Sequence, residues 1–185
     1  MTTLTKHSDE ILMTSLANGN QKAASELYHR YSKNIYGYFI RMTQDMELAQ
    51  DLTQNVFLKI IQFCYTWEET KTFRFWIFRI ARNVLIDHHR VEQKFFKTES
   101  EESIQEWDFN ISTQENYKKE QTDMLLDAIT KLPAGMRELI ELSRFQGFSY
   151  KEIAQMTVSN ENAIRVKTFR ALSKLKEIIT LNKEL

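Results

Sequence analysis

The sequence contains few of the residues that cross-link a chain or interrupt its secondary structure. Its 185 residues include one cysteine, one proline and four glycines. The single cysteine, Cys64, excludes an internal disulfide framework and a cysteine-rich zinc site, and it fits a reducing cytosol. The scarcity of proline and glycine favours long helices over many short strands, because few tight turns can be made.

Long hydrophobic runs are also missing. No stretch approaches the roughly 18 uninterrupted apolar residues of a membrane span, so we expect a cytoplasmic protein without direct membrane insertion. Hydrophobic residues nevertheless make up 42% of the chain and aromatic residues 12%, which is enough for a sizeable core.

Charge is balanced overall but not along the chain. The formal net charge is zero, yet the segment from Lys97 to Tyr117 holds one basic residue against six acidic residues. The flanking blocks are mildly basic, which is weak support for DNA binding. It suggests that the affinity for DNA depends partly on a partner protein. The acidic segment has the composition of a flexible linker, although Trp107 and Phe109 predict that part of it occupies a groove.

Before this segment, helical periodicity predicts a bundle. A short helix is expected over Asp9–Ala17, a second from Asn20 to about Met42, a third from Asp45, and a fourth over Phe73–Arg90. In the third helix, the residues expected to point inward are Leu48, Leu52, Val56, Ile60 and Ile61. Three long amphipathic helices and a short leader predict a compact domain from Met1 to about Phe96.

The stretch Phe73–Arg90, FRFWIFRIARNVLIDHHR, alternates aromatic and basic residues. One arc of its helical wheel, as expected for packing on a core, carries Phe73, Trp76, Ile77, Ile80, Ala81 and Val84. The opposite arc carries Phe75, Phe78 and Ile86 between Arg79 and Arg82. Exposed rings among guanidinium groups would suit unpaired bases and phosphates. A helix buried on two sides, with arginines reaching solvent, would explain the same pattern.

After the acidic segment the periodicity is again helical. We expect helices over Gln121–Lys131, from Pro133 to about Phe145, over YKEIAQMT, and from Glu161 to about Thr180. Ser149 and Glu152 have the S-x-x-E spacing of a capping box, and Asn160 can cap the last helix. Two helices around a tight turn, the second rich in Arg and Lys, predict a helix-turn-helix.

The last helix has an outward face that combines basic and apolar side chains. This face results from placing inward Ile164, Thr168, Ala171, Leu172 and Leu175. Its candidate DNA-contacting residues are Asn162, Arg165, Val166, Lys167, Phe169, Arg170 and Lys174. In a major groove, apolar atoms can meet thymine methyl groups and Arg can bridge guanine. Ordinary packing of a helical hairpin is the alternative interpretation.

Nothing in the sequence predicts catalysis. Asp87, His88 and His89 are adjacent, so on a helix they point in different directions and make a poor metal site. The HExxH, P-loop and GxSxG motifs do not occur. We therefore expect no enzyme activity, no metal or other cofactor, and no small-molecule substrate.

Five stretches, taken in order, resemble the extracytoplasmic-function (ECF) sigma factors of bacterial RNA polymerase, in the sigma-70 superfamily. They are DLTQNVFLKI with FRFWIFRIARNVLIDHHR, then LPAGMRELIEL, then FSYKEIAQMT, and ENAIRVKTFRAL. The resemblance spans about Asp9–Lys176 and implies an all-α fold of two helical domains, 1–96 and 118–185, with 97–117 as linker. It implies a promoter-specificity subunit whose partners are core RNA polymerase, promoter DNA and an anti-sigma factor.

The resemblance also assigns roles to residues. The first domain would dock on core polymerase through Asp51, Gln54, Asn55 and Phe57. The minus-ten element would be recognised and melted at the helix that holds Arg79, Arg82, Asn83 and Asp87, to which the outward aromatic arc adds Phe75 and Phe78. The second domain would read the minus-thirty-five element through the outward face of the last helix.

The sequence departs from the family pattern at three positions. Asn55 stands where the family usually has Glu, Val158 occupies the usual glycine of the turn, and Thr168 replaces a usual aliphatic residue. At Val158 the turn must either avoid a positive φ or carry strain.

A second function stays open at the level of sequence. A free-standing transcriptional regulator could bind DNA through Asn160–Lys176 and use the N-terminal bundle as a sensor or dimeriser. Such a regulator would bind duplex DNA without core polymerase, whereas a sigma factor would require it.

Overall fold

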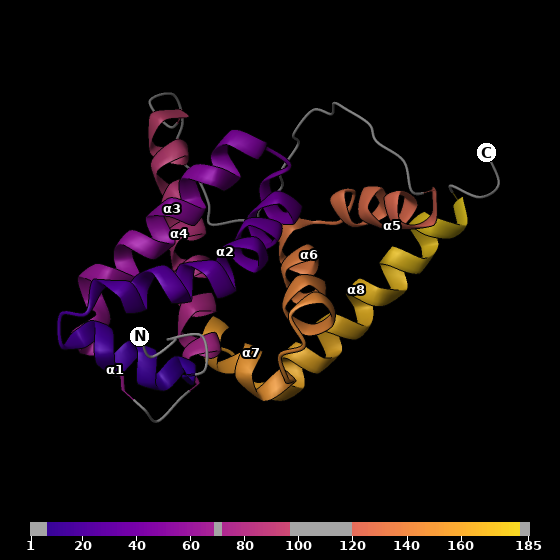
Figure 1. Cartoon of the computed structure of the whole chain (residues 1–185). Helices are drawn as coiled ribbons and strands as arrows, with labels where there is room; N and C mark the ends of the chain where they lie inside the picture. The colour runs from indigo at the N-terminus through magenta and orange to yellow at the C-terminus, as the bar shows by residue number, and fades with distance from the viewer. Residues whose placement is uncertain (1–6, 69–71, 97–119, 182–185) are drawn as a thin grey trace. The chain divides into compact units, whose positions relative to one another are not determined.

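The computed structural model of the chain describes residues 7–68, 72–96 and 120–181, and every regular element within them is helical (Figure 1). The predicted all-α fold is confirmed. Contacts between Cα atoms divide the chain into two units, Met1–Ile40 with Asp45–Glu102, and Arg41–Gln44 with Ser103–Leu185. The acidic segment lies outside the described residues. Among the described helices, none is long and apolar enough to cross a membrane.

The described residues before the acidic segment form four α-helices and one 3₁₀ turn. They are α1 (Asp9–Ala17), α2 (Gln21–Thr43), α3 (Met46–Phe63), the turn η2 (Cys64–Thr66) and α4 (Phe73–Phe96). Two of them begin at the predicted polar caps. Asn20 Oδ1 accepts from the Lys22 amide at 3.2 Å, and Asp45 Oδ1 accepts from the Leu48 amide at 3.0 Å.

An ionic cluster fixes α1 against α2. The Asp9 carboxylate accepts from Arg30 Nη1 at 2.7 Å and from the Tyr31 hydroxyl at 2.5 Å. Arg30 also donates to Glu26 at 2.8 Å, which holds its guanidinium in place. Burial, together with the hydrogen bond to Asp9, raises the pKa of Tyr31 well above its usual range, so this hydroxyl remains a donor at neutral pH.

Aromatic contacts between α2 and α4 form the centre of the N-terminal core. Tyr31 meets Phe73 at a ring-centroid distance of 5.1 Å, and Tyr38 meets Phe78 at 6.0 Å, both edge to face. Edge-to-face pairs add roughly 0.5–1.5 kcal/mol to the stabilisation from burial alone. Other side chains buried in the N-terminal helices α1–α4 are Leu12, Leu27, Ile35, Val56 and Ile77.

Burial on α4 overturns part of the sequence prediction. Phe75 is 3% exposed and Phe78 is fully buried, so the prediction that both rings face solvent is wrong. The physical reason is that α4 contacts α1 and α3, and its rings also meet α2, so the core covers more than one arc of the helix. The alternative of a helix buried on two sides describes Phe75 and Phe78 correctly. Trp76, predicted to lie in the core arc, is only half-buried.

On α3 the inward prediction is confirmed for three of the five residues, Leu48 is only half-buried, and the prediction is wrong for Ile61. Leu52, Val56 and Ile60 are buried. Ile61 is half exposed, because a residue one position after Ile60 is turned about a quarter of the helix away from the core. Leu58 also projects outward, with 65% of its surface exposed.

The described residues 120–181 of the second unit form four α-helices. They are α5 (Glu120–Thr130), α6 (Ala134–Ile140), which continues into a π-helical turn η4 (Glu141–Phe145), α7 (Tyr150–Thr157) and α8 (Glu161–Leu181). The long helix α8 contacts α5, α6 and α7. The core between these helices includes Ala128, Ile129, Leu132, Ile140, Ala171 and Leu175. Arg137 on α6 donates to the carbonyls of Thr130 and Leu132, which closes the C-terminal end of α5.

The predicted helix-turn-helix is formed by α7 and α8. The Ser149 amide donates to the Glu152 carboxylate at 2.8 Å and the Ser149 hydroxyl accepts from the Glu152 amide at 3.3 Å, which confirms the capping box. Asn160 Oδ1 accepts from the Ala163 amide at 2.8 Å, so Asn160 caps α8 as predicted. Between the two helices, Val158 adopts φ 52° and ψ 50°. The turn therefore carries strain, because a β-branched residue is disfavoured in the left-handed region.

The unequal burial on α4 generates the first prediction. Phe78→Ala should lower the free energy of unfolding by about 3–5 kcal/mol, since it removes a fully buried ring. Trp76→Ala, which removes a half-buried ring, should cost much less. Urea unfolding of both full-length variants, followed by circular dichroism, measures this difference. Equal losses of stability for the two variants would contradict the burial assigned to α4.

The second prediction concerns the strained turn at Val158. Val158→Gly should raise the free energy of unfolding by about 1 kcal/mol, because glycine reaches positive φ without steric strain. Val158 is 95% exposed, so the substitution removes almost no packing. Val158→Ala is the matched control and should recover only part of the gain, since alanine keeps a Cβ. A glycine variant that is no more stable than the parent in thermal unfolding would rule out strain at this position.

Candidate DNA and polymerase interfaces

The exposed side of α3 carries the predicted polymerase-docking residues. Asp51, Gln54 and Asn55 are all exposed. Leu58 follows them at the spacing i, i+3, i+4, i+7, which places the four side chains on one face of the helix. We call Asp51, Gln54, Asn55 and Leu58 the α3 face. Sequence reasoning missed Leu58, although its spacing from Asp51 was available to find it.

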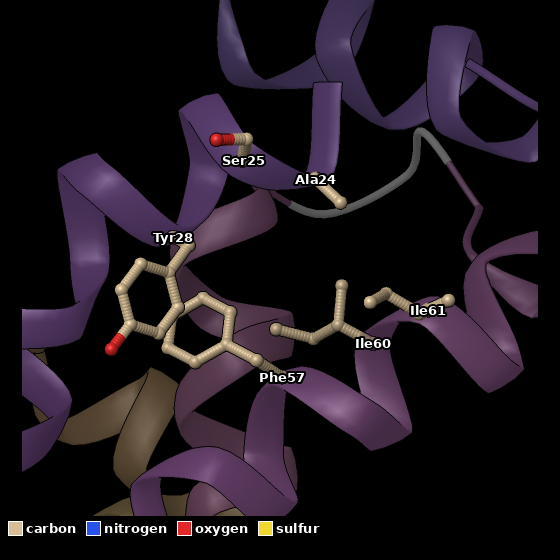
Figure 2. Close-up of a pocket in the computed structure, with 6 residues that line it drawn as sticks. All are labelled: Ala24, Ser25, Tyr28, Phe57, Ile60 and Ile61. Carbon is tan, nitrogen blue, oxygen red and sulfur yellow. The ribbon is translucent and has the colours of Figure 1, made fainter. Parts of the chain in front are cut away.

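Phe57 does not share the α3 face. Its ring is buried and stacks edge to face on Tyr28 of α2, with ring centroids 4.7 Å apart (Figure 2). The Phe57 ring therefore packs α3 against α2 and is not exposed for the predicted docking role. The two rings line an apolar pocket of about 180 Å³ whose other lining residues are Ala24, Ser25, Ile60 and Ile61.

A second pocket opens along the exposed strip of α4. Its volume is about 310 Å³, near the lower end of the size range of ligand pockets. It is lined by Lys59, Phe63, Thr66, Trp76, Arg79, Ile80, Asn83 and Asp87. Two aromatic rings, two cationic groups, an amide and a carboxylate thus surround one small space. We call it the α3–α4 pocket, because every lining residue except Thr66 belongs to one of these two helices. Thr66 lies in the turn η2.

The chemistry of the α3–α4 pocket suits an unstacked nucleobase. The rings of Phe63 and Trp76 offer surfaces for stacking, worth roughly 1–3 kcal/mol per base. Asn83 and Asp87 supply the hydrogen-bonding groups that can read the edge of a base, as pockets for extruded nucleotides do. Lys59 and Arg79 supply positive charge for the adjoining phosphates.

Only part of the predicted minus-ten set reaches this pocket. Arg79, Asn83 and Asp87 line it together, whereas Phe75 and Phe78 are in the core and Arg82 is not among the lining residues. Trp76, which sequence reasoning assigned to the core arc, is the aromatic residue of α4 that lines the pocket. Its spacing to Arg79, Asn83 and Asp87 follows one helical stripe, and that stripe was the signal available in the sequence.

The structure brings the whole predicted DNA-reading set of α8 to the surface. The exposed residues are Asn162, Arg165, Val166, Lys167, Phe169, Arg170 and Lys174. The predicted inward residues Ile164, Thr168, Ala171 and Leu175 are buried, and Leu172 is half-buried. The predicted orientation of the helix is therefore confirmed.

Charge on the outward side of α8 is only partly neutralised. Arg165 pairs with Glu161 at 3.2 Å and Lys174 with Glu177 at 3.1 Å. Exposed pairs of this kind are worth little, so phosphate contacts can replace them. Lys167 and Arg170 form no ion pair with any described residue. The helix therefore presents a basic surface suited to a nucleic-acid backbone.

Comparison with known proteins identifies two regions of one family, in order along the chain. The family model for sigma-70 region 2 matches residues 27–95, and that for sigma-70 region 4 matches residues 122–175. The first match includes the α3 face and the α3–α4 pocket. The second includes the helix-turn-helix.

Related proteins match most of the chain. The RNA polymerase sigma factor SigZ of Bacillus subtilis (strain 168) is 30% identical over 155 residues, which are 83% of this chain and 85% of SigZ. The ECF RNA polymerase sigma factor SigM of the same organism is 28% identical over 153 residues, 83% of this chain and 93% of SigM.

A solved structure shares the fold. The sigma factor RpoE from Bartonella quintana, in co-crystals with the anti-sigma factor NepR, superimposes with a TM-score of 0.67 at 20% identity. The match covers 84% of this chain and 96% of that chain. With two sigma-70 regions in order and curated relatives over most of its length, the chain belongs to the ECF group of the sigma-70 family of RNA polymerase sigma factors.

Proposed function

We propose that this sigma factor works through three surfaces. The α3 face docks on core RNA polymerase, the α3–α4 pocket receives the minus-ten element as it is unpaired, and α8 reads the minus-thirty-five element in the major groove. The proposal divides the chain into a polymerase and minus-ten domain over 1–96, a linker over 97–117 and a minus-thirty-five domain over 118–185. The protein acts in the cytoplasm. It needs no catalytic group of its own, because polymerase performs the chemistry.

The α3–α4 pocket is the observation that carries the proposal. Core packing removes Phe75 and Phe78 from the surface, yet Trp76 remains beside Arg79 and Asn83 at the edge of a small pocket. Helix packing alone does not require an indole ring, an amide and two cationic groups around one open pocket. A single extruded base uses each of them, for stacking, edge recognition and phosphate contact.

Leu58 supports the polymerase-docking role of the α3 face. It is an exposed aliphatic side chain among polar neighbours, and apolar anchors surrounded by polar groups are typical of protein interfaces. Its neighbours Gln54 and Asn55 can add hydrogen bonds at the rim. A free-standing regulator would use α8 but would leave both the α3 face and the α3–α4 pocket without a role.

An anti-sigma factor is a further proposed partner. The solved structure of the sigma factor RpoE from Bartonella quintana, which shares this fold, is a complex with the anti-sigma factor NepR. A protein of this kind would control the chain by covering one or both of its domains.

Docking through the α3 face predicts a selective loss of polymerase binding. Leu58→Asp should weaken binding to core polymerase by about tenfold or more, since it places an unpaired carboxylate at the centre of an interface. Met46→Asp is the matched control, because Met46 is a similarly exposed apolar residue of α3 that lies off this face. Fluorescence titration of labelled protein with core polymerase measures both affinities. Equal affinities for the two variants would remove Leu58 from the interface.

Base capture in the α3–α4 pocket predicts a defect in promoter opening. Trp76→Ala should reduce open complexes at least fivefold, from the loss of a stacking contact of roughly 1–3 kcal/mol, while binding to core polymerase is kept. Trp76→Phe retains a ring and should restore most of the opening. Run-off transcription and permanganate reactivity of the promoter report on this step. If Trp76→Ala opened promoters normally, or if it lost polymerase binding to the same extent, the pocket would not be the site of base capture.

A further inference from the structure

A series of side-chain contacts outside the α3–α4 pocket connects the ring of Trp76 to α1. The Asp9 carboxylate of α1 accepts a hydrogen bond from the Tyr31 hydroxyl at 2.5 Å. The Tyr31 ring meets the Phe73 ring edge to face, with centroids 5.1 Å apart. Phe73 in turn meets Trp76 at a centroid distance of 6.1 Å, with the ring planes tilted by 43°. Both ring distances lie in the range of roughly 4.5–7 Å that is typical of attractive aromatic pairs.

The residues in the middle of this series are themselves fixed. Phe73 is fully buried, so its ring cannot shift without disturbing the close-packed core. The Tyr31 hydroxyl is fixed by Asp9, and the Asp9 carboxylate is fixed in turn by Arg30 at 2.7 Å. A displacement of Tyr31 would therefore displace Phe73, and with it the ring that Trp76 contacts.

Trp76 lies in a part of α4 where such support matters. The Thr72 hydroxyl accepts from the Phe75 amide at 3.3 Å, and the Thr72 carbonyl accepts from the Trp76 amide at 3.2 Å. Trp76 thus closes the first turn of the helix, and a first turn has few backbone hydrogen bonds of its own. The Trp76 side chain is only half-buried. Its contact with Phe73 therefore restrains a ring that core packing alone would leave partly free.

The helix α1 also supports a second part of the pocket. It contacts both α4 and the turn η2, and η2 contributes Thr66 to the pocket lining. With nine residues, α1 is too short to be a stable helix by itself, so its position depends on contacts such as those of Asp9. The contacts of Asp9 therefore influence the pocket both through η2 and through Tyr31.

Resting on the proposed capture of a base in the α3–α4 pocket, we propose that Tyr31 is a positioning residue for promoter opening. Held by Asp9, it sets the place of Phe73 and thereby orients the Trp76 ring for stacking on an extruded base. Tyr31 is not among the residues that line the pocket, so it acts without touching DNA. A ring that is already oriented loses less conformational freedom when the base arrives, which favours binding.

The test is a double-mutant cycle in holoenzyme reconstituted from the full chain and core polymerase. Tyr31→Phe removes the hydroxyl alone and Tyr31→Leu removes the ring as well, and each is combined with Trp76→Ala. Permanganate reactivity measures the fraction of open promoter, and fluorescence titration measures the affinity for core polymerase. Tyr28→Leu is the matched control, because Tyr28 is another α2 tyrosine whose ring packs edge to face, but on Phe57 of α3.

Tyr31→Phe should reduce open complexes roughly twofold to tenfold, the range expected for the loss of one hydrogen bond. Tyr31→Leu should reduce them further, whereas Tyr28→Leu should leave them unchanged, and all three should keep their affinity for core polymerase. When Trp76→Ala is present, neither Tyr31 substitution should cause an additional loss, because a residue that acts through Trp76 then has no ring to position. If Tyr31→Leu fails to fold, Tyr31→Phe alone decides the outcome.

Three results would overturn the positioning role. They are normal opening by Tyr31→Phe, an equal loss with and without Trp76, and a loss of opening that merely follows a loss of affinity for core polymerase. If Trp76→Ala lowers opening but Tyr31→Phe does not, base capture stands and only the positioning role fails. If Trp76→Ala itself opens promoters normally, the proposed base capture fails, and the positioning role fails with it.

Discussion

The N-terminal unit depends on how broadly α4 is buried. Phe73 and Phe78 pack edge to face on α2, and Phe75 is withdrawn from solvent with them. This packing uses most of the circumference of α4 for stability. Only a narrow strip remains for function, and the groups that can bind DNA, from Trp76 to Asp87, are concentrated there beside α3. Packing and the proposed recognition of DNA thus use different sides of one helix.

In α8 the buried and exposed residues are separated more simply. One stripe of small and aliphatic residues, from Ile164 to Leu175, is buried, and the basic and apolar residues project from the rest of the helix. The turn before α8 holds Val158 at a positive φ, and that local cost is offset by the packing of α7 and α8 on each other. The strained turn fixes where α8 begins, and the buried stripe fixes which side of it can meet DNA.

Local signals made much of this predictable from the sequence. The caps at Asp45 and Asn160 and the capping box at Ser149 depend only on residues within one turn, so their spacing was sufficient. The orientation of α8 followed from a single apolar stripe. The orientation of α4 did not, because aromatic residues occur all around it and periodicity does not reveal how many helices surround a given helix. The burial of Phe57 was not predicted for a related reason, since its partner Tyr28 lies far away in sequence.

In the proposed function, this chain opens promoter DNA only as a subunit of RNA polymerase. Permanganate oxidises unpaired thymines, so permanganate reactivity across a selected promoter reports whether the strands have separated. We expect reactive thymines in and just downstream of the minus-ten element when the full chain and core polymerase are both present, and none with either alone. Reactive thymines with the chain alone, or a fully paired promoter in the presence of both, would refute the proposed function.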